Sequence, residues 1–252
     1  MENTPTTTVQ LLAFASFKVT TPEGRVILVD PWITGNKLLP EGLSWPEQVD
    51  LILITHGHGD HLDTRLVEVV QEKSIKVVAN PLVRWYLREQ GLPDSILEGM
   101  NVGGTIFPLE EVAVTMTNAF HVSHVNQPDG KVGYTHATVG FILRLSDGYT
   151  IYFAADTSVF GDMRLIGEIY RPDLAVLPIG DRFTMGPLEA SHAIRLLQVK
   201  HVIPCHYGNF GGLTGTPAAL QALIADMPDV QLHVLEAGES WTPAKRLVGA
   251  SH

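Results

Sequence analysis

The stretch "LILITHGHGDHLD", residues 51–63, runs from a continuous apolar segment straight into three histidines and an aspartate that fall within six residues. The apolar part, with the two residues before it, reads "VDLILI". It predicts a short strand buried on both faces, because no polar residue alternates with the aliphatic ones. Polar groups that follow such a strand must be paired or coordinated, since an isolated polar group beside an apolar core is costly. The stretch therefore predicts a polar centre at the end of a buried strand.

The spacing within this stretch favours metal binding. His56 and His58 are two residues apart, so in extended chain their side chains share one side. Asp60 and His61 then point elsewhere, which suits a second metal ion close to the first. We expect the two interspersed glycines to remove bulk and to permit tight turns. Histidine and aspartate together suit borderline divalent ions such as zinc, manganese or iron.

Several other predicted strands also end in a residue that can bind a metal ion. These strand-end residues are Asp30, His56, His121, Asp156, Asp181 and His206. Taken alone, each later histidine is more typical of a buried, hydrogen-bonded side chain, and each aspartate of a turn. Ligand sites in layered α/β proteins gather at one end of the strands, so we expect these residues to meet at one centre.

The remaining pattern alternates apolar runs with amphipathic stretches. We expect one strand over residues 9–19, paired with another over 24–30 through a turn at "TPEG", and a hairpin with its turn at Asp147 and Gly148. Helices are expected over 62–73, 81–91, 187–198 and 216–227, and a last strand over 230–235. Strand-rich portions followed by strand–helix alternation occur twice. We therefore expect residues 1–252 to form a single domain of two similar halves, about 1–125 and 126–252, with two packed sheets and helices outside.

Composition limits the class of protein. The chain has 252 residues, 45% of them hydrophobic, and a formal net charge of −10, which argues against nucleic acid or an anionic membrane as the partner. Its single cysteine, Cys205, excludes an internal disulfide and a cysteine-rich zinc site. The first residues lack a basic signal-peptide region, and no run of 18 apolar residues occurs. A cytoplasmic protein acting on a small molecule is the expectation.

The string His56-Gly57-His58-Gly59-Asp60-His61 resembles the HxHxDH signature of the metallo-β-lactamase superfamily. The later order also fits, with His121, Asp156 in "AADTSVF" and His206 in "PCHYGNF". The strings "LVDPWITGN", "GDRFTMGP" and "HYGNF" are similar, more narrowly, to metal-dependent hydrolases related to ascorbate-6-phosphate lactonase (UPF0173-like). The resemblance implies an α/β (α+β) fold, the four-layer αββα sandwich of that superfamily.

The resemblance also implies roles for individual residues. His56, His58 and His121 would hold the first metal ion, Asp60, His61 and His206 the second, and Asp156 would bridge the two. The cofactors would be two divalent ions, with Zn²⁺ as first choice and Mn²⁺ or Fe²⁺ as alternatives. A hydroxide held between them would attack an ester- or lactone-type bond in a small molecule. Asp60 would be the catalytic carboxylate, and Asp30 would orient a metal-bound imidazole.

Further residues have weaker signals. His124 is either an exposed loop histidine or a contact for substrate or proton transfer. Asp181 and Arg182 follow a predicted strand, and Arg182 either clamps an anionic substrate or forms a surface ion pair. The chain has Ala13 and Phe14 where the related hydrolases commonly have Gly-His. This difference leaves the seven expected ligands intact but puts the family's substrate in question.

Two other functions remain open at this point. The same site could hydrolyse a small cyclic phosphodiester or nucleic acid, although the acidic charge disfavours the second substrate. A non-catalytic metal-binding protein is a further alternative, which the complete set of expected ligands argues against. By analogy with related proteins, association into a homo-oligomer is also expected.

Overall fold

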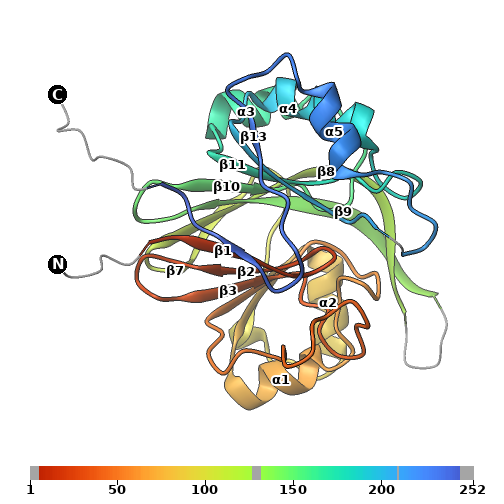
Figure 1. The fold of residues 1–252 in the computed structure, drawn as a ribbon. Helices are drawn as coiled ribbons and strands as arrows, with labels where there is room; N and C mark the ends of the chain where they lie inside the picture. The colour runs from red at the N-terminus through yellow and green to blue at the C-terminus, as the bar shows by residue number, and fades with distance from the viewer. Residues whose placement is uncertain (1–5, 127–131, 209, 245–252) are drawn as a thin grey trace, which may run out of the picture.

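The structure is a computed structural model that describes residues 6–126, 132–208 and 210–244. Two seven-stranded sheets pack face to face, and helices cover the outer face of each sheet, so the molecule has four layers (Figure 1). This arrangement confirms the predicted α/β class and the αββα architecture.

The first sheet contains the N-terminal strands and one strand from the C-terminal end of the chain. Its order is β14-β1-β2-β3-β4-β5-β6. Neighbours from β14 to β3 are antiparallel, and neighbours from β3 to β6 are parallel. The bounds are β1 Thr8–Ala13, β2 Ser16–Thr20, β3 Val26–Val29, β4 Leu51–Ile54, β5 Lys76–Ala79, β6 Leu97–Gly99 and β14 Ser240–Trp241.

The second sheet repeats this pairing pattern, with order β13-β12-β11-β10-β9-β8-β7. Neighbours from β7 to β10 are antiparallel, and neighbours from β10 to β13 are parallel. The bounds are β7 Thr105–Leu109, β8 Val112–Asn126, β9 Val132–Arg144, β10 Thr150–Phe153, β11 Leu174–Pro178, β12 His201–Cys205 and β13 Gln231–Leu232.

Five α-helices lie on the outer faces of the sheets within the described residues. Helices α1 and α2 cover the first sheet, and α3, α4 and α5 cover the second (Figure 1). Their bounds are α1 Leu66–Lys73, α2 Pro81–Glu89, α3 Met163–Tyr170, α4 Pro187–Leu197 and α5 Pro217–Leu223, and a 3₁₀ turn, η1, spans Asp94–Ile96. None of the described helices is both long and apolar enough to cross a bilayer.

Strand β4 shows how the layers are held together. Leu51 and Leu53 face the apolar core between the sheets, whereas Ile52 and Ile54 face the core under α1 and α2. All four side chains have no exposed surface. Burial of each contributes roughly 1.5–3 kcal/mol before the loss of conformational entropy is counted. This two-sided burial fixes the point at which the chain leaves the core and reaches His56.

The structure corrects three boundaries that the sequence predicted. The strand expected over 9–19 is two strands, because the chain reverses at Phe14 and Ala15. The sheets change between Gly99 and Thr105, earlier than the expected division near residue 125, because β7 and β8 pair locally with each other. The strand expected over 230–235 is reduced to β13, and β14 returns to pair with β1 in the first sheet.

The carboxyl ends of the parallel strands lie close together, and one glycine allows their closest approach. A Cβ placed on Gly180, which follows β11, would lie 2.1 Å from the carbonyl oxygen of His206, which follows β12. No side chain fits at this distance, so the backbone at His206 would have to shift. Gly180 therefore sets where the last predicted ligand lies.

We predict that Gly180→Ala destabilises the protein by about 1–3 kcal/mol, as overpacking generally does, and displaces His206. Gly161→Ala is the matched control, because a Cβ at Gly161 has no neighbour within 4 Å. Chemical denaturation should show a change within about 0.5 kcal/mol for this control. Equal stability of both variants would contradict the steric argument.

Candidate metal centre

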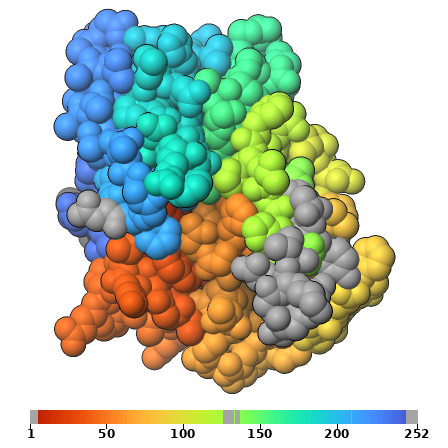
Figure 2. Space-filling model, turned by 90° about the vertical axis from the view of Figure 1, so that its right-hand side faces the viewer, coloured from red at the N-terminus to blue at the C-terminus, as the bar shows by residue number. Residues whose placement is uncertain are grey.

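The seven expected ligands come together where the two sheets meet. His56, His58, Asp60 and His61 follow β4, His121 lies within β8, Asp156 follows β10 and His206 follows β12. The segments around residues 40–60, 120, 180 and 210 adjoin one another on the face drawn in Figure 2. Within the described chain, three groups of side chains have ligand atoms close enough to hold an ion. Two of them together contain all seven ligands: His56, His58, His121 and Asp156; and Asp60, His61 and His206. The third joins Asp30 to His56 and His61.

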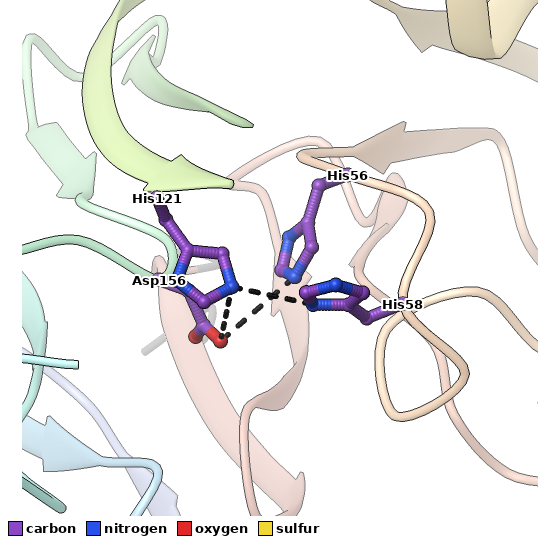
Figure 3. A group of neighbouring side chains, drawn as sticks. All are labelled: His56, His58, His121 and Asp156. Carbon is purple, nitrogen blue, oxygen red and sulfur yellow. Dashed lines mark hydrogen bonds and ion pairs between the residues drawn. The ribbon is translucent and has the colours of Figure 1, made fainter. Parts of the chain in front are cut away.

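The first group joins two imidazoles from the loop after β4, one from β8 and the carboxylate that follows β10 (Figure 3). His121 Nε2 lies 3.2 Å from His58 Nδ1. His56 Nε2 lies 3.8 Å and His121 Nε2 lies 3.7 Å from the same oxygen, Asp156 Oδ2. All four side chains thus point at a common space, into which His56 projects from the fully buried side.

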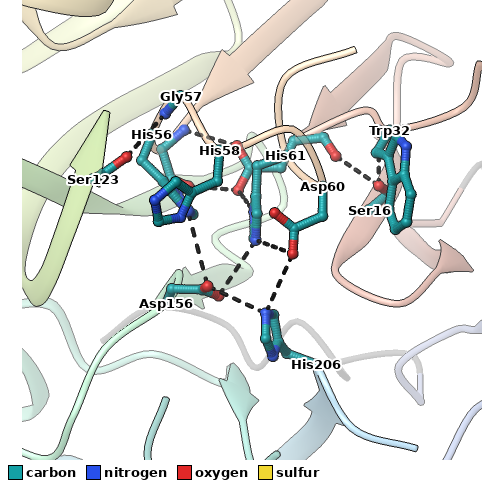
Figure 4. A network of polar contacts seen from close by, with 12 residues as sticks. Ser16, Trp32, His56, Gly57, His58, Asp60, His61, Ser123, Asp156 and His206 are labelled. Carbon is teal, nitrogen blue, oxygen red and sulfur yellow. Dashed lines mark hydrogen bonds and ion pairs between the residues drawn. The ribbon is translucent and has the colours of Figure 1, made fainter. Parts of the chain in front are cut away.

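The second group lies on the other side of the same carboxylate (Figure 4). Asp60 Oδ2 lies 3.9 Å from His61 Nε2 and 3.7 Å from His206 Nε2. His61 Nε2 lies 3.4 Å from Asp156 Oδ1, and His206 Nε2 lies 3.2 Å from Asp156 Oδ2. Asp156 therefore contacts imidazoles of both groups.

Two buried nitrogen atoms show that the residues fit a cation. His56 Nε2 and His61 Nε2 are both out of contact with solvent and have no hydrogen-bond partner in the described structure. Both face Asp156. Buried polar atoms are normally satisfied, so a converging pair without partners requires an explanation. A divalent ion bound by these nitrogens supplies one, because histidine nitrogen and carboxylate oxygen are ordinary ligands of zinc and similar ions.

The pKa values of the imidazoles in the first group favour binding of a cation. Burial lowers the pKa of His56 well below its usual value, and the neighbouring His61 lowers it further. Burial and the adjacent His121 lower the pKa of His58 to about 4. Burial also lowers the pKa of His121. These imidazoles are therefore neutral at pH 7 and offer lone pairs to a metal ion.

The second group is held together by charge. Burial alone would lower the pKa of His61 and His206, but the neighbouring carboxylates, Asp156 first and Asp60 with it, together raise the first well above its usual value and the second to about 9. Burial alone would raise the pKa of Asp156, but His61 and His206 lower it well below its usual value. A cation that enters this group therefore replaces protons that the two carboxylates hold in place.

Asp30 and Thr55 orient two of these imidazoles. The Asp30 carboxylate accepts hydrogen bonds from the Thr55 backbone N–H (2.7 Å) and hydroxyl (2.5 Å), and its Oδ2 lies 2.9 Å from His61 Nδ1. The Thr55 hydroxyl gives its one proton to the carboxylate, so it accepts from His56 Nδ1, 2.9 Å away. Both imidazoles thus carry a proton on Nδ1 and turn Nε2 toward the centre.

Sequence reasoning missed several supporting residues. Thr55 is one. Asp63 accepts from the backbone N–H groups of Ile33 (2.7 Å) and Thr34 (2.6 Å) and so ties the loop after β3 to the histidine-rich loop. Thr157 accepts from the N–H of Phe120 (2.9 Å), which precedes His121. The available signal was a buried-looking Thr or Asp beside each ligand, which is also typical of ordinary turns.

The weaker sequence predictions have different outcomes. His124 is half-buried and its ring centroid lies 5.0 Å from that of His58, so it adjoins the centre. Asp181 is exposed and its carboxylate accepts from the Arg182 N–H and the Thr214 hydroxyl, so it is engaged within its own loop. Arg182 is exposed, with its guanidinium 5.2 Å from the Phe183 ring. Gly59 lies in the predicted turn, where the N–H groups of His61 and Leu62 donate to the His58 carbonyl, although a Cβ there would meet nothing within 4 Å.

Comparison with known proteins agrees with this fold. A family model described as "Beta-lactamase superfamily domain" matches residues 25–207. A UPF0173 metal-dependent hydrolase from Rubrobacter xylanophilus is 44% identical over 234 residues, which cover 92% of this chain and 95% of that protein. Another from Chloroflexus aurantiacus is 44% identical over 217 residues, covering 84% of this chain and 87% of the relative.

Among solved structures, Igni18, described as a novel metallo hydrolase from the archaeon Ignicoccus hospitalis, superposes with a TM-score of 0.80 and 28% identity. The superposition covers 96% of this chain and all of Igni18. Fold, His/Asp cluster and relatives together define a metal-dependent hydrolase of the metallo-β-lactamase superfamily. Within that class the chain belongs to the UPF0173 metal-dependent hydrolase family, which confirms the predicted enzyme class.

We predict that Thr55→Val weakens metal binding roughly 10–100-fold, as loss of a hydrogen bond that orients a ligand generally does. The change removes the hydroxyl shared by Asp30 and His56 and keeps the side-chain volume similar. Thr105→Val is the matched control, because it removes a hydroxyl from a residue of β7 that shares a hydrogen bond with the Thr115 hydroxyl. Competition with a chromogenic chelator measures the affinity, and equal affinity of the two variants would refute the role of Thr55.

Proposed function

We propose that the protein hydrolyses an ester- or lactone-type bond in a small molecule with a centre of two divalent ions, most simply Zn²⁺, with Mn²⁺ or Fe²⁺ as alternatives. His56, His58 and His121 would hold one ion, and Asp60, His61 and His206 the other. Asp156 would bridge them. The established family supports metal-dependent hydrolysis, and the geometry supports the finer assignment.

The observation that carries the proposal is the position of Asp156. Its Oδ2 faces His56 and His121 of the first group at 3.8 and 3.7 Å and His206 of the second at 3.2 Å. Its Oδ1 faces His61 at 3.4 Å. A carboxylate shared in this way suits a bridging ligand, because both oxygens can bind and the negative charge offsets two cations at once.

Two divalent ions bound here would lower the pKa of a water molecule and polarise the substrate's carbonyl oxygen. The exposure of the ligand side chains indicates the side from which the substrate would enter. His58, Asp60, His121 and His124 are half-buried and line the open side, whereas His56, His61, Asp156 and His206 are buried. Asp60 has a side chain 23% exposed, against 4% for Asp156, so Asp60 is the carboxylate that can touch a water molecule and accept its proton.

A small neutral or weakly charged substrate suits the rest of the molecule better than nucleic acid does. The net charge is −10, and repulsion of a polyphosphate chain would work against binding. Assays with lactones and with bis-p-nitrophenyl phosphate, run in parallel on the metal-loaded enzyme, separate the proposal from its alternative. Faster turnover of the phosphodiester would contradict the proposed ester hydrolysis and favour phosphodiester hydrolysis at the same centre.

We predict that Asp60→Asn lowers kcat by about 10²–10⁴-fold, the usual contribution of a positioned acid or base. The amide cannot accept the proton, although its size is unchanged. Asp162→Asn is the matched control, because Asp162 is exposed and its side chain makes no cap hydrogen bond to α3. Near wild-type turnover of Asp60→Asn in steady-state assays would remove Asp60 from its catalytic role.

We also predict that the purified protein, stripped with a chelator and reloaded with zinc, binds two ions per chain. His56→Ala should lose an ion from the first group and abolish turnover, while His192→Ala, a change of an exposed histidine on α4, should keep both. Elemental analysis after gel filtration measures the ratio. A ratio of one in the wild-type protein would leave a mononuclear centre and exclude the bridging role of Asp156.

A further inference from the structure

Three aromatic rings form a cluster directly against His206. The centroid of the Phe14 ring lies 4.2 Å from that of the His206 imidazole, with the planes inclined by 42°. Phe210 lies 4.9 Å from Phe14, Trp32 lies 5.7 Å from Phe210, and Phe14 and Trp32 are 6.2 Å apart. The cluster therefore consists of Phe14, Trp32 and Phe210, each in contact with the other two.

This aromatic cluster runs from the buried Phe14 ring, which is 7% exposed, to the surface. None of its rings belongs to the three hydrophobic cores that hold the described layers together. Phe210 is 37% exposed and Trp32 is half-buried, so the cluster presents apolar surface to solvent. Figure 4 shows Trp32 on the side of the centre where Asp60 and His206 lie, away from Ser123. Apolar surface beside a polar catalytic centre is typical of a substrate pocket.

The apolar surface continues beyond the cluster. Phe183 is 53% exposed, and a Cβ placed on Gly211 would lie 3.4 Å from its ring. Phe183 therefore lies beside the loop that carries Phe210. Together they extend the apolar surface from the second group of ligands along the rim of the centre.

The backbone of Phe14 is held in an unusual conformation. Its φ is +58°, which bulky side chains rarely adopt. The Phe14 carbonyl accepts a hydrogen bond from the His206 N–H at 3.1 Å. Strained residues of this kind persist where the surrounding structure over-determines them, and they cluster at ligand sites. The link to His206 fixes the Phe14 ring relative to the catalytic centre.

We propose that Phe14, Trp32 and Phe210 form the subsite for an aromatic or other flat apolar group of the substrate. The inference rests on the proposed hydrolysis and narrows its substrates to aryl-substituted esters and lactones. Large aromatic faces bind apolar rings by area and by stacking, and they offer few partners to the hydroxyl groups of a polyol. A ring held there lies beside His206 and places the adjoining carbonyl group near Asp60.

A purely structural role of the cluster would depend on a different residue than substrate binding would. Supporting the His206 imidazole requires Phe14, whose ring contacts it, whereas the ring pairs of Phe210 among the described residues are with Phe14 and Trp32. Phe210 is therefore the residue whose change separates the two roles.

The test compares three δ-lactones on the zinc-loaded enzyme: dihydrocoumarin, which carries a fused aromatic ring, δ-valerolactone, which lacks it, and glucono-δ-lactone, a polyol. We expect Phe210→Ala to lower kcat/KM for dihydrocoumarin at least about tenfold, the scale on which an apolar pocket discriminates. The value for δ-valerolactone should stay nearly unchanged, and Phe210→Tyr should retain most activity toward dihydrocoumarin. Phe107→Ala is the matched control, because Phe107 is 70% exposed on β7.

Two kinetic outcomes would overturn the subsite. An equal loss for dihydrocoumarin and δ-valerolactone would show that the cluster only positions the centre. A wild-type kcat/KM highest for glucono-δ-lactone would show that the substrate is a polyol. Zinc content, measured for each variant, must match the wild type for the comparison to count.

Failure of the proposed hydrolysis has a separate signature. If the wild-type enzyme cleaves none of the lactones, calorimetry on the zinc-loaded protein compares two carboxylate products, 3-(2-hydroxyphenyl)propanoate and 5-hydroxypentanoate. Tighter binding of the aryl acid, lost in Phe210→Ala, would support the subsite although the reaction is different. Equal binding of the two acids would overturn the subsite itself.

Discussion

The buried carboxylate of Asp156 is the group on which the arrangement of both sheets depends. Its side chain is 4% exposed, and its oxygens face His56 from the first sheet and His206 from the second. Removing a carboxylate from water costs several kcal/mol unless opposite charge and good geometry compensate. That compensation exists only if the ends of β4, β10 and β12 meet at one place, beside His121 of β8. The compensation of the Asp156 charge and the packing of the two layers therefore both require these strands to meet.

The same convergence explains where the backbone is strained. Nine described non-glycine residues have positive φ, and three of them, Ser74, Arg171 and Gln198, are ordinary C-terminal caps of helices. Of the other six, Phe14, Asp30, Ala155 and His206 lie at or beside the centre, and Asp181 and Arg182 lie in the loop after β11. A left-handed residue directly after a strand turns the chain sharply and aims the next side chains inward. Each costs on the order of 1–3 kcal/mol, which the buried core of the two sheets can offset.

The fold class could be predicted because apolar runs alternate with amphipathic stretches and the HxHxDH string resembles a family signature, and the structure brings together the ligands that this resemblance implies. The residues that orient the ligands could not be predicted. Thr55 and Asp63 make decisive hydrogen bonds, yet threonine and aspartate are equally common in turns that bind nothing. The change of sheet between Gly99 and Thr105 was also hidden, since it depends on β7 pairing with β8 rather than on any local break in the pattern.

The turn at Phe14 had no glycine or asparagine to mark it, so the sequence suggested one long strand. This position shows that the metal ligands and the residues proposed to select the substrate come from different parts of the fold. The ligands lie at strand ends whose place is fixed by packing, except for His121 within β8. The aromatic cluster comes instead from the β1–β2 turn and from the loops that follow β3 and β12, which carry Trp32 and Phe210. Loops change more freely than the core that supports them, so the substrate can change while the ligands stay in place. That is why a departure at residue 14 can alter what is bound while leaving the seven ligands intact.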